Sequence, residues 1–465
     1  MSGIFGLVSK KDCVETLFYG TDYHSHLGTQ FAGLAVWGTS LNKKIHDISG
    51  AQFKSRFYPE LNGLRGNKGV GVISGQQPQP IVINSRFGQF ALVTNGFIEN
   101  SRELAEEMLS EGESFSDSFD SQINATELVA KLINRGSSIN EGIEKMFAQI
   151  RGSCSLLILT KDGLWASRDR FGYTPLIVGE RRGEFAVTTE TAAFSNLGFN
   201  IKKFLGPGEV VFINAKGMKS KVPGRAKKQI CSFLWIYAGF PASTYEGINV
   251  ETVRERCGAF LAKADKLKVD LAGGIPDSGT THAIGYAMES HVSFRRPLVK
   301  YTPGFDRSYT PPSQARRDLI AKMKLVAIRD IIKGKRIVIC DDSIVRGTQL
   351  KNFTVQKLWD NGAREVHLRI ACPPLMFPCK FNYSTRSISE LATHRAIKDI
   401  EKKEPRGIAA YLDEDSPQYK RMVSWIARDV HATTLKYQRL ADMIKAIGLP
   451  QEDLCLYCWT GKAAR

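Results

Sequence analysis

The sequence predicts two domains of different fold class, an α+β domain followed by an α/β domain with a parallel sheet. In roughly the first 220 residues, short apolar stretches such as 70–73, 91–94 and 154–159 are separated by glycine-rich turns and interrupted by two helical stretches. This mixture is typical of α+β domains. From about residue 230 onward the order becomes strand, helix, strand, which indicates parallel strands joined by crossover helices.

Composition excludes several classes of protein. The chain has 465 residues, of which 43% are hydrophobic and 24% charged, as in ordinary globular proteins of two or three domains. It contains no apolar run of about 18 residues, and its apolar start lacks the basic segment of a signal peptide. We therefore expect a cytoplasmic protein without a membrane span.

The net charge of +17 suits anionic ligands. The Lys and Arg residues are scattered in pairs rather than collected in long blocks, so nucleic acid is the less favoured partner. A phosphorylated small molecule is the better interpretation of the charge.

The main feature of the second half is a strand–helix–strand unit. Residues 336–340 form a short apolar strand, residues 350–361 have the apolar spacing of a helix that Gly362 ends, and residues 366–370 alternate as the next strand. Ligands of open α/β sheets bind at the carboxyl ends of such strands. The segment that follows residue 340 is therefore the predicted binding site.

This segment combines acidic residues with a phosphate-binding type of loop. Two aspartates end the strand, and a loop with one glycine and two hydroxyl residues opens the helix, whose backbone N–H groups favour phosphate. The carboxylates suit ribose hydroxyls or a bridging Mg²⁺ ion. Two acids alone are better explained as a plain helix cap, but the complete run is far more specific. The candidate contacts are Asp341, Asp342, Ser343, Ile344, Val345, Arg346, Gly347 and Thr348.

The run 337–348 closely resembles the phosphoribosyl diphosphate (PRPP) fingerprint of phosphoribosyltransferases. Pro276-Asp277-Ser278-Gly279 resembles the pyrophosphate loop of glutamine PRPP amidotransferases, the first enzymes of de novo purine synthesis, and residues 307–324 resemble their basic lid. Taken alone, the lid's basic residues fit a solvated helix face equally well. The resemblance implies that Ser278, Asp341 and Asp342 hold Mg²⁺. It adds to the PRPP contacts Asp277, Ser278, Gly279, Arg307, Arg317, Lys322 and Lys324.

The resemblance covers nearly the whole chain and assigns its domains. It implies a glutamine amidotransferase type 2 domain at 2–225, with the αββα sandwich fold of N-terminal-nucleophile hydrolases. A type I phosphoribosyltransferase domain with a parallel sheet follows at 226–430, and a helical tail that carries cluster cysteines occupies 431–465. The basic segment 216–228, which contains Pro and Gly, is predicted to be the linker.

The nine cysteines do not predict a disulfide framework, because the count is odd and no export signal precedes them. Four of them fall where the iron–sulfur branch of the family has its ligands, and four thiolates are what a [4Fe–4S] cluster needs. Zinc is the alternative for four cysteines, and spacing alone fits four unrelated core residues equally well. The implied ligands are Cys231, Cys379, Cys455 and Cys458.

In the first domain the resemblance implies an N-terminal nucleophile. Ser2 stands where the family has a cysteine, and removal of Met1 would expose its α-amino group as the base. Asn95 and Gly96 match the family's oxyanion pair. His24 and His26 are read as core or surface residues rather than as site residues.

Three positions that carry charge in the family are uncharged in this chain. Ser74 stands for the Arg that binds the glutamine carboxylate, Leu27 for a second Arg, and Ala125 for the Asp that holds the amine. Each loss of a charged partner in a binding pocket costs about 2–5 kcal/mol. We therefore predict that Ser2 is the natural residue and that the glutaminase site is degenerate.

These observations leave three functional hypotheses. The first is an enzyme that forms 5-phosphoribosylamine from PRPP and releases pyrophosphate, with nitrogen from free ammonia, a partner glutaminase, or glutamine through an altered site. The second is a non-catalytic PRPP or nucleotide sensor that pairs with an active relative. The third keeps Ser2 as the nucleophile for a less polar amide, which the hydrophobic Leu27 and Ile73 would suit. A homo-oligomer is expected by analogy with the family.

Overall fold

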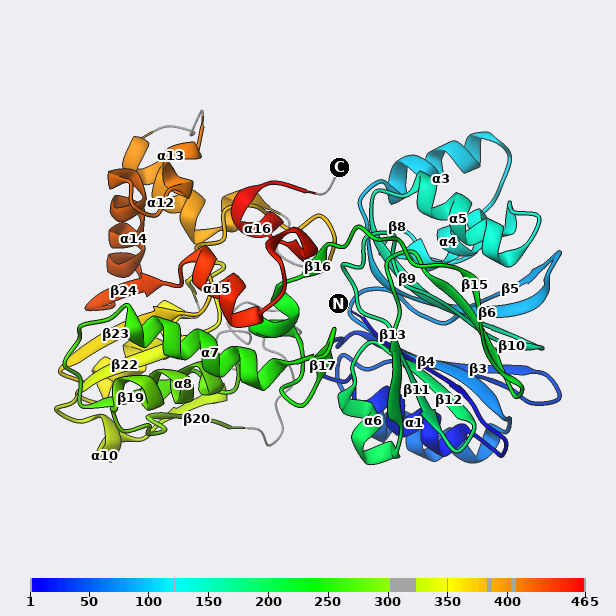
Figure 1. Ribbon diagram of the computed structural model, residues 1–465, viewed down its shortest axis with the longest axis horizontal. Coiled ribbons are helices and arrows are strands. Elements are labelled where there is room, and N and C mark those ends of the chain that lie inside the picture. Colours follow the sequence, from blue (N-terminus) through cyan, green and yellow to red (C-terminus); the bar gives the residue numbers. More distant parts are fainter. Residues whose placement is uncertain are drawn as a thin grey trace.

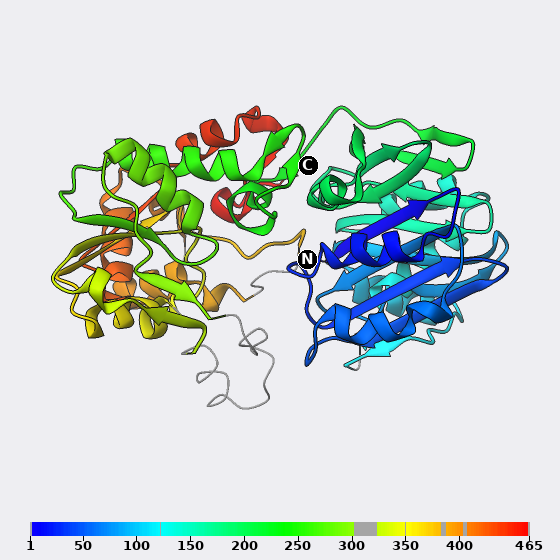
Figure 2. The same ribbon diagram turned by 90° about the horizontal axis from the view of Figure 1, so that it is seen from below.

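The computed structural model describes residues 2–120, 122–301, 323–348, 350–382, 387–402 and 407–463. Figure 1 shows two domains side by side, the first in blue to green and the second in green to red. Figure 2 turns the same view by 90°, and in both views β1 starts on the side of the first domain that faces the second. In the described part of the chain, no helix is long and apolar enough to cross a membrane.

The first domain is built from two antiparallel sheets. The seven-stranded sheet has the order β13-β11-β12-β1-β4-β2-β3, and the six-stranded sheet has the order β15-β14-β10-β9-β6-β5. The first comprises β1 (Gly3–Val8), β2 (Phe31–Trp37), β3 (Leu41–Asp47), β4 (Lys68–Ser74), β11 (Ile177–Arg181), β12 (Glu184–Thr188) and β13 (Asn200–Phe204). The second comprises β5 (Ile81–Ser85), β6 (Gly88–Ile98), β9 (Gly152–Thr160), β10 (Gly163–Ser167), β14 (Val210–Asn214) and β15 (Gly217–Val222).

The central strands of these sheets are buried on both faces, because helices cover each outer side. Successive side chains of a strand point to opposite faces. In β1, Ile4 packs into the core between the two sheets, whereas Phe5 packs into the core beneath the outer helices. One side carries α1 (Val14–Asp22), α2 (Phe53–Phe57) and α6 (Ala192–Leu197), and the other α3 (Ser101–Ser110), α4 (Ala125–Asn134) and α5 (Ile139–Gln149). The predicted αββα sandwich is confirmed.

The second domain contains a four-stranded parallel sheet of order β19-β22-β23-β24. Residues 337–340 in β22 are completely buried, as expected for a parallel strand that is covered on both faces. Helices α7 (Val250–Lys263) and α8 (Thr280–Ser290) pack together, with α8 against the sheet, while α12 (Ala392–Glu401) packs on α14 (Pro417–Asp429). The strands are β19 (Leu271–Gly274), β22 (Arg336–Asp341), β23 (Glu365–Ile370) and β24 (Thr434–Tyr437). The predicted parallel sheet is confirmed.

Two local predictions were wrong. The predicted linker 216–228 contains β15, an edge strand that pairs with β14. Edge strands often carry lysines, so such a strand resembles a linker in sequence. The predicted helical tail 431–465 contains β24, whose pairing with β23 is a long-range contact that the local sequence does not reveal. The predicted helix 350–361 is confirmed as helical, with a π-helical first part, Leu350–Val355, that continues into α11 (Gln356–Asp360).

The two domains meet at a junction that includes residues 230–231 and the tail. The short strand β16 (Ile230–Cys231) pairs in parallel with β25 (Leu454–Cys455). Across the junction, Arg168 forms a 2.6 Å ion pair with Glu246, and the ring of Tyr173 stacks on Phe381 at 3.9 Å. These contacts connect the first domain to the second domain.

A buried ion pair links the sheet of the second domain to the end of α7. Arg369 in β23 donates to Asp265 at 2.5 Å, and the exposed fractions of the two side chains are 1% and 4%. Tyr286 donates to the same carboxylate at 2.9 Å. Burial alone would raise the pKa of Asp265, but the hydrogen bond and charge of Arg369 hold it below its usual value of 3.8.

We predict that Asp265→Ala lowers the free energy of unfolding of the second domain by about 3–5 kcal/mol, because the buried Arg369 would lose its carboxylate partner. Urea unfolding followed by tryptophan fluorescence measures this change. The stabilisation by Asp265 is present above the unfolded pKa and is lost as the pH falls through the lower folded pKa. Glu106→Ala, which breaks an exposed pair with Arg102, should change stability by less than about 1 kcal/mol. Equal effects of the two substitutions would contradict the prediction.

Candidate active sites

Two loops meet at the carboxyl edge of the parallel sheet. Asp341 is the last residue of β22, and Ser278 lies in the loop between β19 and α8. The Ser278 hydroxyl donates to Asp341 Oδ1 at 3.2 Å, and the backbone N–H of Asp342 donates to the same oxygen at 2.9 Å. The neighbouring Asp277 is exposed and forms a 3.0 Å ion pair with Lys300. The two predicted loops therefore form one site.

Glycine allows the first loop to lie directly on the end of β22. A Cβ atom on Gly279 would lie 2.2 Å from the carbonyl oxygen of Cys340, and one on Gly274 would lie 2.3 Å from the carbonyl oxygen of Gly279. Both positions exclude any side chain. The N-terminus of α8, which begins at Thr280, is thereby placed beside the two aspartates.

The paired aspartates have perturbed ionisation. Burial, together with the negative charge of Asp342, raises the pKa of Asp341 well above its usual value, and burial raises the pKa of Asp342. The nearby guanidinium of Arg254 directs its hydrogen bonds to the backbone carbonyls of Trp235, Tyr237 and Gly239. The carboxylate pair therefore favours a proton or a cation.

The second loop, residues 343–348, is hydrogen-bonded to Asp342 and to the start of α12. The Ser343 hydroxyl donates to Asp342 Oδ1 at 2.5 Å, and the carbonyl of Val345 accepts from the N–H of Ala392 at 2.8 Å. Arg346 pairs with Glu390 at 2.8 Å, and Gly347 has a φ of +76°, which favours glycine. The residues predicted from the sequence thus form one continuous loop around the end of β22.

The predicted basic residues lie on a segment that the structure describes only at its ends. Lys324 precedes β21 (Leu325–Ala327), which pairs with β20 (Leu298–Lys300). The backbone carbonyl of Lys324 accepts a hydrogen bond from the N–H of Tyr301 at 2.8 Å. Arg307, Arg317 and Lys322 lie outside the described residues.

A second candidate site surrounds the start of β1. The backbone nitrogen of the buried Ser2 donates to Asn95 Oδ1 at 3.1 Å. The adjacent Gly96 has a φ of +147°, and a Cβ atom there would lie 2.2 Å from the carbonyl oxygen of Ser153. The predicted nucleophile and oxyanion pair are therefore neighbours. Ser2 directly precedes β1, and Asn95 and Gly96 lie in β6.

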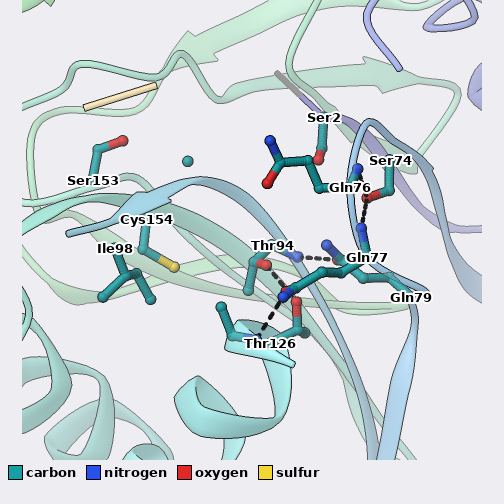
Figure 3. A pocket seen from close by; sticks show the side chains of 12 residues that line it. Ser2, Ser74, Gln76, Gln77, Gln79, Thr94, Ile98, Thr126, Ser153 and Cys154 are labelled. Carbon is teal, nitrogen blue, oxygen red and sulfur yellow. Dashed lines mark hydrogen bonds between the residues drawn. The ribbon is translucent and has the colours of Figure 1, made fainter. Parts of the chain in front are cut away.

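A small cavity of about 20 Å³ lies beside Ser2 (Figure 3). Every described residue that lines it is uncharged, including Ser74 and Ala125, the positions where the sequence resemblance implies charged residues in the family. Leu27 lines an adjacent cavity together with Ser2 and Asn95. The lining consists of Ser2, Ser74, Gln76, Gln77, Gln79, Thr94, Gly96, Ile98, Ala125, Thr126, Ser153 and Cys154.

The glutamines of this lining were not identified from the sequence. Gln77 Oε1 accepts from the N–H of Ala125 at 2.8 Å, and Gln79 Oε1 accepts from the N–H of Thr94 at 2.8 Å. These bonds tie the loop after β4 to α4 and β6. The only sequence signal was three glutamines within residues 76–79, which did not indicate where their side chains point.

The histidines near Ser2 have different surroundings. His24 is completely buried and bonds to the carbonyl of Gly20 and the hydroxyl of Thr188, and burial lowers its pKa to about 4. His26 pairs at 3.1 Å with Glu190, which also accepts from Tyr245 of the second domain at 2.8 Å. Glu190 lines the adjacent cavity and was not identified from the sequence.

The four predicted cluster cysteines come together at the domain junction. Pairing of β16 with β25 sets Cys231 opposite Cys455. Cys379 Sγ accepts from the N–H groups of Phe381 and Asn382 at 3.4 and 3.3 Å. A hydrogen bond from Cys458 lowers the pKa of Cys379 to about 7. Within the described ranges, no three His, Cys, Asp or Glu side chains are arranged to hold a single metal ion.

Comparison with known proteins shows the family of the chain. Residues 70–196 match the glutamine amidotransferase domain. The chain is 32% identical to the amidophosphoribosyltransferase of Methanocaldococcus jannaschii, over 99% of this chain and 97% of that protein, and 30% identical to that of Bacillus subtilis, over 99% and 93%. The solved glutamine PRPP amidotransferase of B. subtilis, complexed with ADP and GMP, has a TM-score of 0.83 at 29% identity, over 99% of this chain and 96% of that chain. The chain therefore belongs to the amidophosphoribosyltransferase family.

Proposed function

We propose that the second domain transfers an amino group to C1 of PRPP and releases pyrophosphate, which forms 5-phosphoribosylamine in the first step of de novo purine synthesis. The observation that carries this proposal is the contact of Ser278 with Asp341, which joins two loops at the carboxyl edge of the parallel sheet. Membership of the family supports it. The relatives named above are all transferases, so they give no support to the alternative of a non-catalytic sensor.

The protein's own residues supply binding and positioning. Loop 343–348 and the start of α8 offer backbone N–H groups and hydroxyls to the phosphates, as helix N-termini do in general. Ammonia is already nucleophilic, so no strong base is required. Alignment of ammonia with C1, and stabilisation of the charge that develops on pyrophosphate, account for the catalysis.

Magnesium fits the aspartate pair. Asp341, Asp342 and Ser278 present oxygen atoms, and Mg²⁺ is usually bound by one or two carboxylates together with substrate phosphates. Two adjacent carboxylates with raised pKa values are stabilised by a divalent cation. When bound, Mg²⁺ supplies positive charge that offsets the charge of the departing pyrophosphate.

Ammonia, rather than glutamine, is the proposed nitrogen source. Glutamine carries a carboxylate and an ammonium group, and the described lining of the Ser2 cavity offers no charged partner to either. The missing partners at Ser74, Leu27 and Ala125 each cost about 2–5 kcal/mol of binding. Free ammonia or a partner glutaminase would then feed the transferase. The partner and a homo-oligomeric assembly stay predictions from the sequence.

A [4Fe–4S] cluster held by Cys231, Cys379, Cys455 and Cys458 is the proposed prosthetic group, with zinc as the alternative. Four thiols with no disulfide between them fit the soft-ligand preference of iron–sulfur clusters. These cysteines come from the segment after the linker, from the loop after β23 and from the tail. The proposed role of the cluster is to join these three segments.

The transferase reaction is tested by pyrophosphate release. Purified protein is given PRPP and Mg²⁺ with either ammonium or glutamine. We expect release with ammonium and none above background with glutamine, since the Ser2 cavity lacks charged partners. Tight PRPP binding with no release from either nitrogen source would overturn the proposal in favour of a sensor. Equal release from both would overturn the ammonia preference.

Asp341→Asn and Asp342→Asn test the aspartate pair. Loss of a charged contact of about 2–5 kcal/mol should lower kcat/KM for PRPP by about 30-fold to several thousand-fold. Steady-state kinetics across Mg²⁺ concentrations measures the change. Asp360→Asn, on the exposed end of α11, is the matched control and should leave kcat/KM unchanged. Wild-type kinetics in both site variants would remove the pair from the mechanism.

The cluster is tested by colour and metal content. The wild-type protein should be brown and contain iron, and Cys455→Ser should lose both the visible absorbance and the iron. Its thermal midpoint should also fall, because three segments would no longer be joined. Cys257→Ser, at a buried cysteine of α7, is the control and should retain iron. A colourless wild-type protein that carries zinc would refute the cluster.

A further inference from the structure

The Ser2 cavity contains the groups of an amide-cleaving site but not those that recognise an amino acid. Ser2 nitrogen lies 3.1 Å from Asn95 Oδ1, and once Met1 is removed this nitrogen becomes an α-amino group next to the Ser2 hydroxyl. Gly96, whose conformation and surroundings exclude a side chain, presents backbone to the same cavity. A nucleophile, a base and polar groups near the reacting carbonyl are the parts that N-terminal-nucleophile chemistry requires.

The charge of the lining selects against zwitterions. A buried carboxylate or ammonium without a partner is strongly disfavoured, whereas a neutral amide needs only hydrogen bonds. Hydroxyl groups of Ser2, Ser74 and Thr94 line the cavity, and they both donate and accept. No charged side chain is found among these described lining residues, and Glu190, in the adjacent cavity that Ser2 and Asn95 also line, already accepts hydrogen bonds from Tyr245 and Phe240. The site is therefore suited to an uncharged amide.

The size of the cavity limits the ligand further. A water molecule needs roughly 10–15 Å³ of cavity volume, so the 20 Å³ beside Ser2 is little more than the space of one water and favours small ligands over large ones. Gln76 occupies part of the space beside Ser2 (Figure 3). The side chains of Gln77 and Gln79 are fixed to backbone atoms, which keeps the walls in place. This limited space favours amides the size of formamide or acetamide over glutamine.

We propose that the first domain is an amidase for small uncharged primary amides, a function separate from the transferase reaction. The Ser2 hydroxyl oxygen bonds to the amide carbon while its proton passes to the α-amino group and then to the leaving nitrogen. The C–N bond breaks, ammonia leaves, and an ester of Ser2 remains. Water hydrolyses the ester and releases the carboxylic acid. The net reaction is amide plus water to carboxylic acid plus ammonia, with no redox step.

The experiment uses the full chain without PRPP and measures ammonia released from formamide, acetamide and glutamine. Mass spectrometry of the purified protein establishes the N-terminus. We expect loss of Met1, ammonia from both small amides and none above background from glutamine. Ser2→Ala should reduce the release at least ~100-fold, in the range of catalytic nucleophile losses. Ser40→Ala, at an exposed serine, is the matched control and should leave the release unchanged.

A size variant tests the cavity itself. Gln76→Ala removes a side chain from the lining and should shift the kcat/KM preference toward butyramide over formamide by about 10-fold or more. Retention of Met1, absence of ammonia from both small amides, equal release in Ser2→Ala, or release from glutamine at the same rate would each overturn the proposal. Since the transferase is assayed by pyrophosphate with ammonium, failure of one activity is distinguishable from failure of the other.

Discussion

The contact of Gly279 with the end of β22 is the constraint on which the transferase site depends. Only a residue without a side chain fits there, since a Cβ would lie 2.2 Å from the carbonyl oxygen of Cys340. This close packing brings Ser278 to within 3.2 Å of Asp341 and directs the start of α8 toward the same edge of the sheet. A loop displaced by one side chain would separate the hydroxyl from the carboxylates, and the site would no longer be a single binding surface.

The two candidate sites differ in charge because different side chains line them. The transferase site combines two carboxylates with raised pKa values and helix N-termini, which suits a magnesium-bound polyphosphate. The cavity beside Ser2 is walled by hydroxyls, amides and apolar groups among its described residues. The αββα framework depends on its apolar cores and not on the side chains at the mouth of the cavity, so the fold of the first domain does not by itself determine which ligand binds there.

Several buried polar contacts lie at the junction between the domains. Glu190 is buried there and accepts hydrogen bonds from Tyr245 at 2.8 Å and from the N–H of Phe240 at 3.1 Å, both from the second domain. Buried charge needs such partners, so this carboxylate favours the docked arrangement of the domains. The pairing of β16 with β25 places residues 230–231 and the tail at the same junction. It brings the predicted cluster cysteines there.

Local sequence determined the parts of this protein that are contiguous in the chain. Residues 341–348 form one loop, and their order alone indicated a phosphate site, because a strand end, two acids and a glycine turn act within a single segment. Fold class was also accessible, since strand alternation and strand–helix order are local patterns. The exposed strand β15 and the four-residue β24 were missed, because each depends on a partner strand and carries a weak pattern of its own.

Tertiary structure decided which distant residues share a site. Ser278 and Asp341 are 63 positions apart, and Ser2 and Asn95 are 93 apart, so their contacts arise from strand order and not from spacing. The glutamines at 77 and 79 and the buried Glu190 acquired their positions in the same way. The sequence by itself specified the chemistry that each residue type offers. The packed fold specified which of these groups face one another, because burial and close glycine contacts allow only one arrangement of the loops.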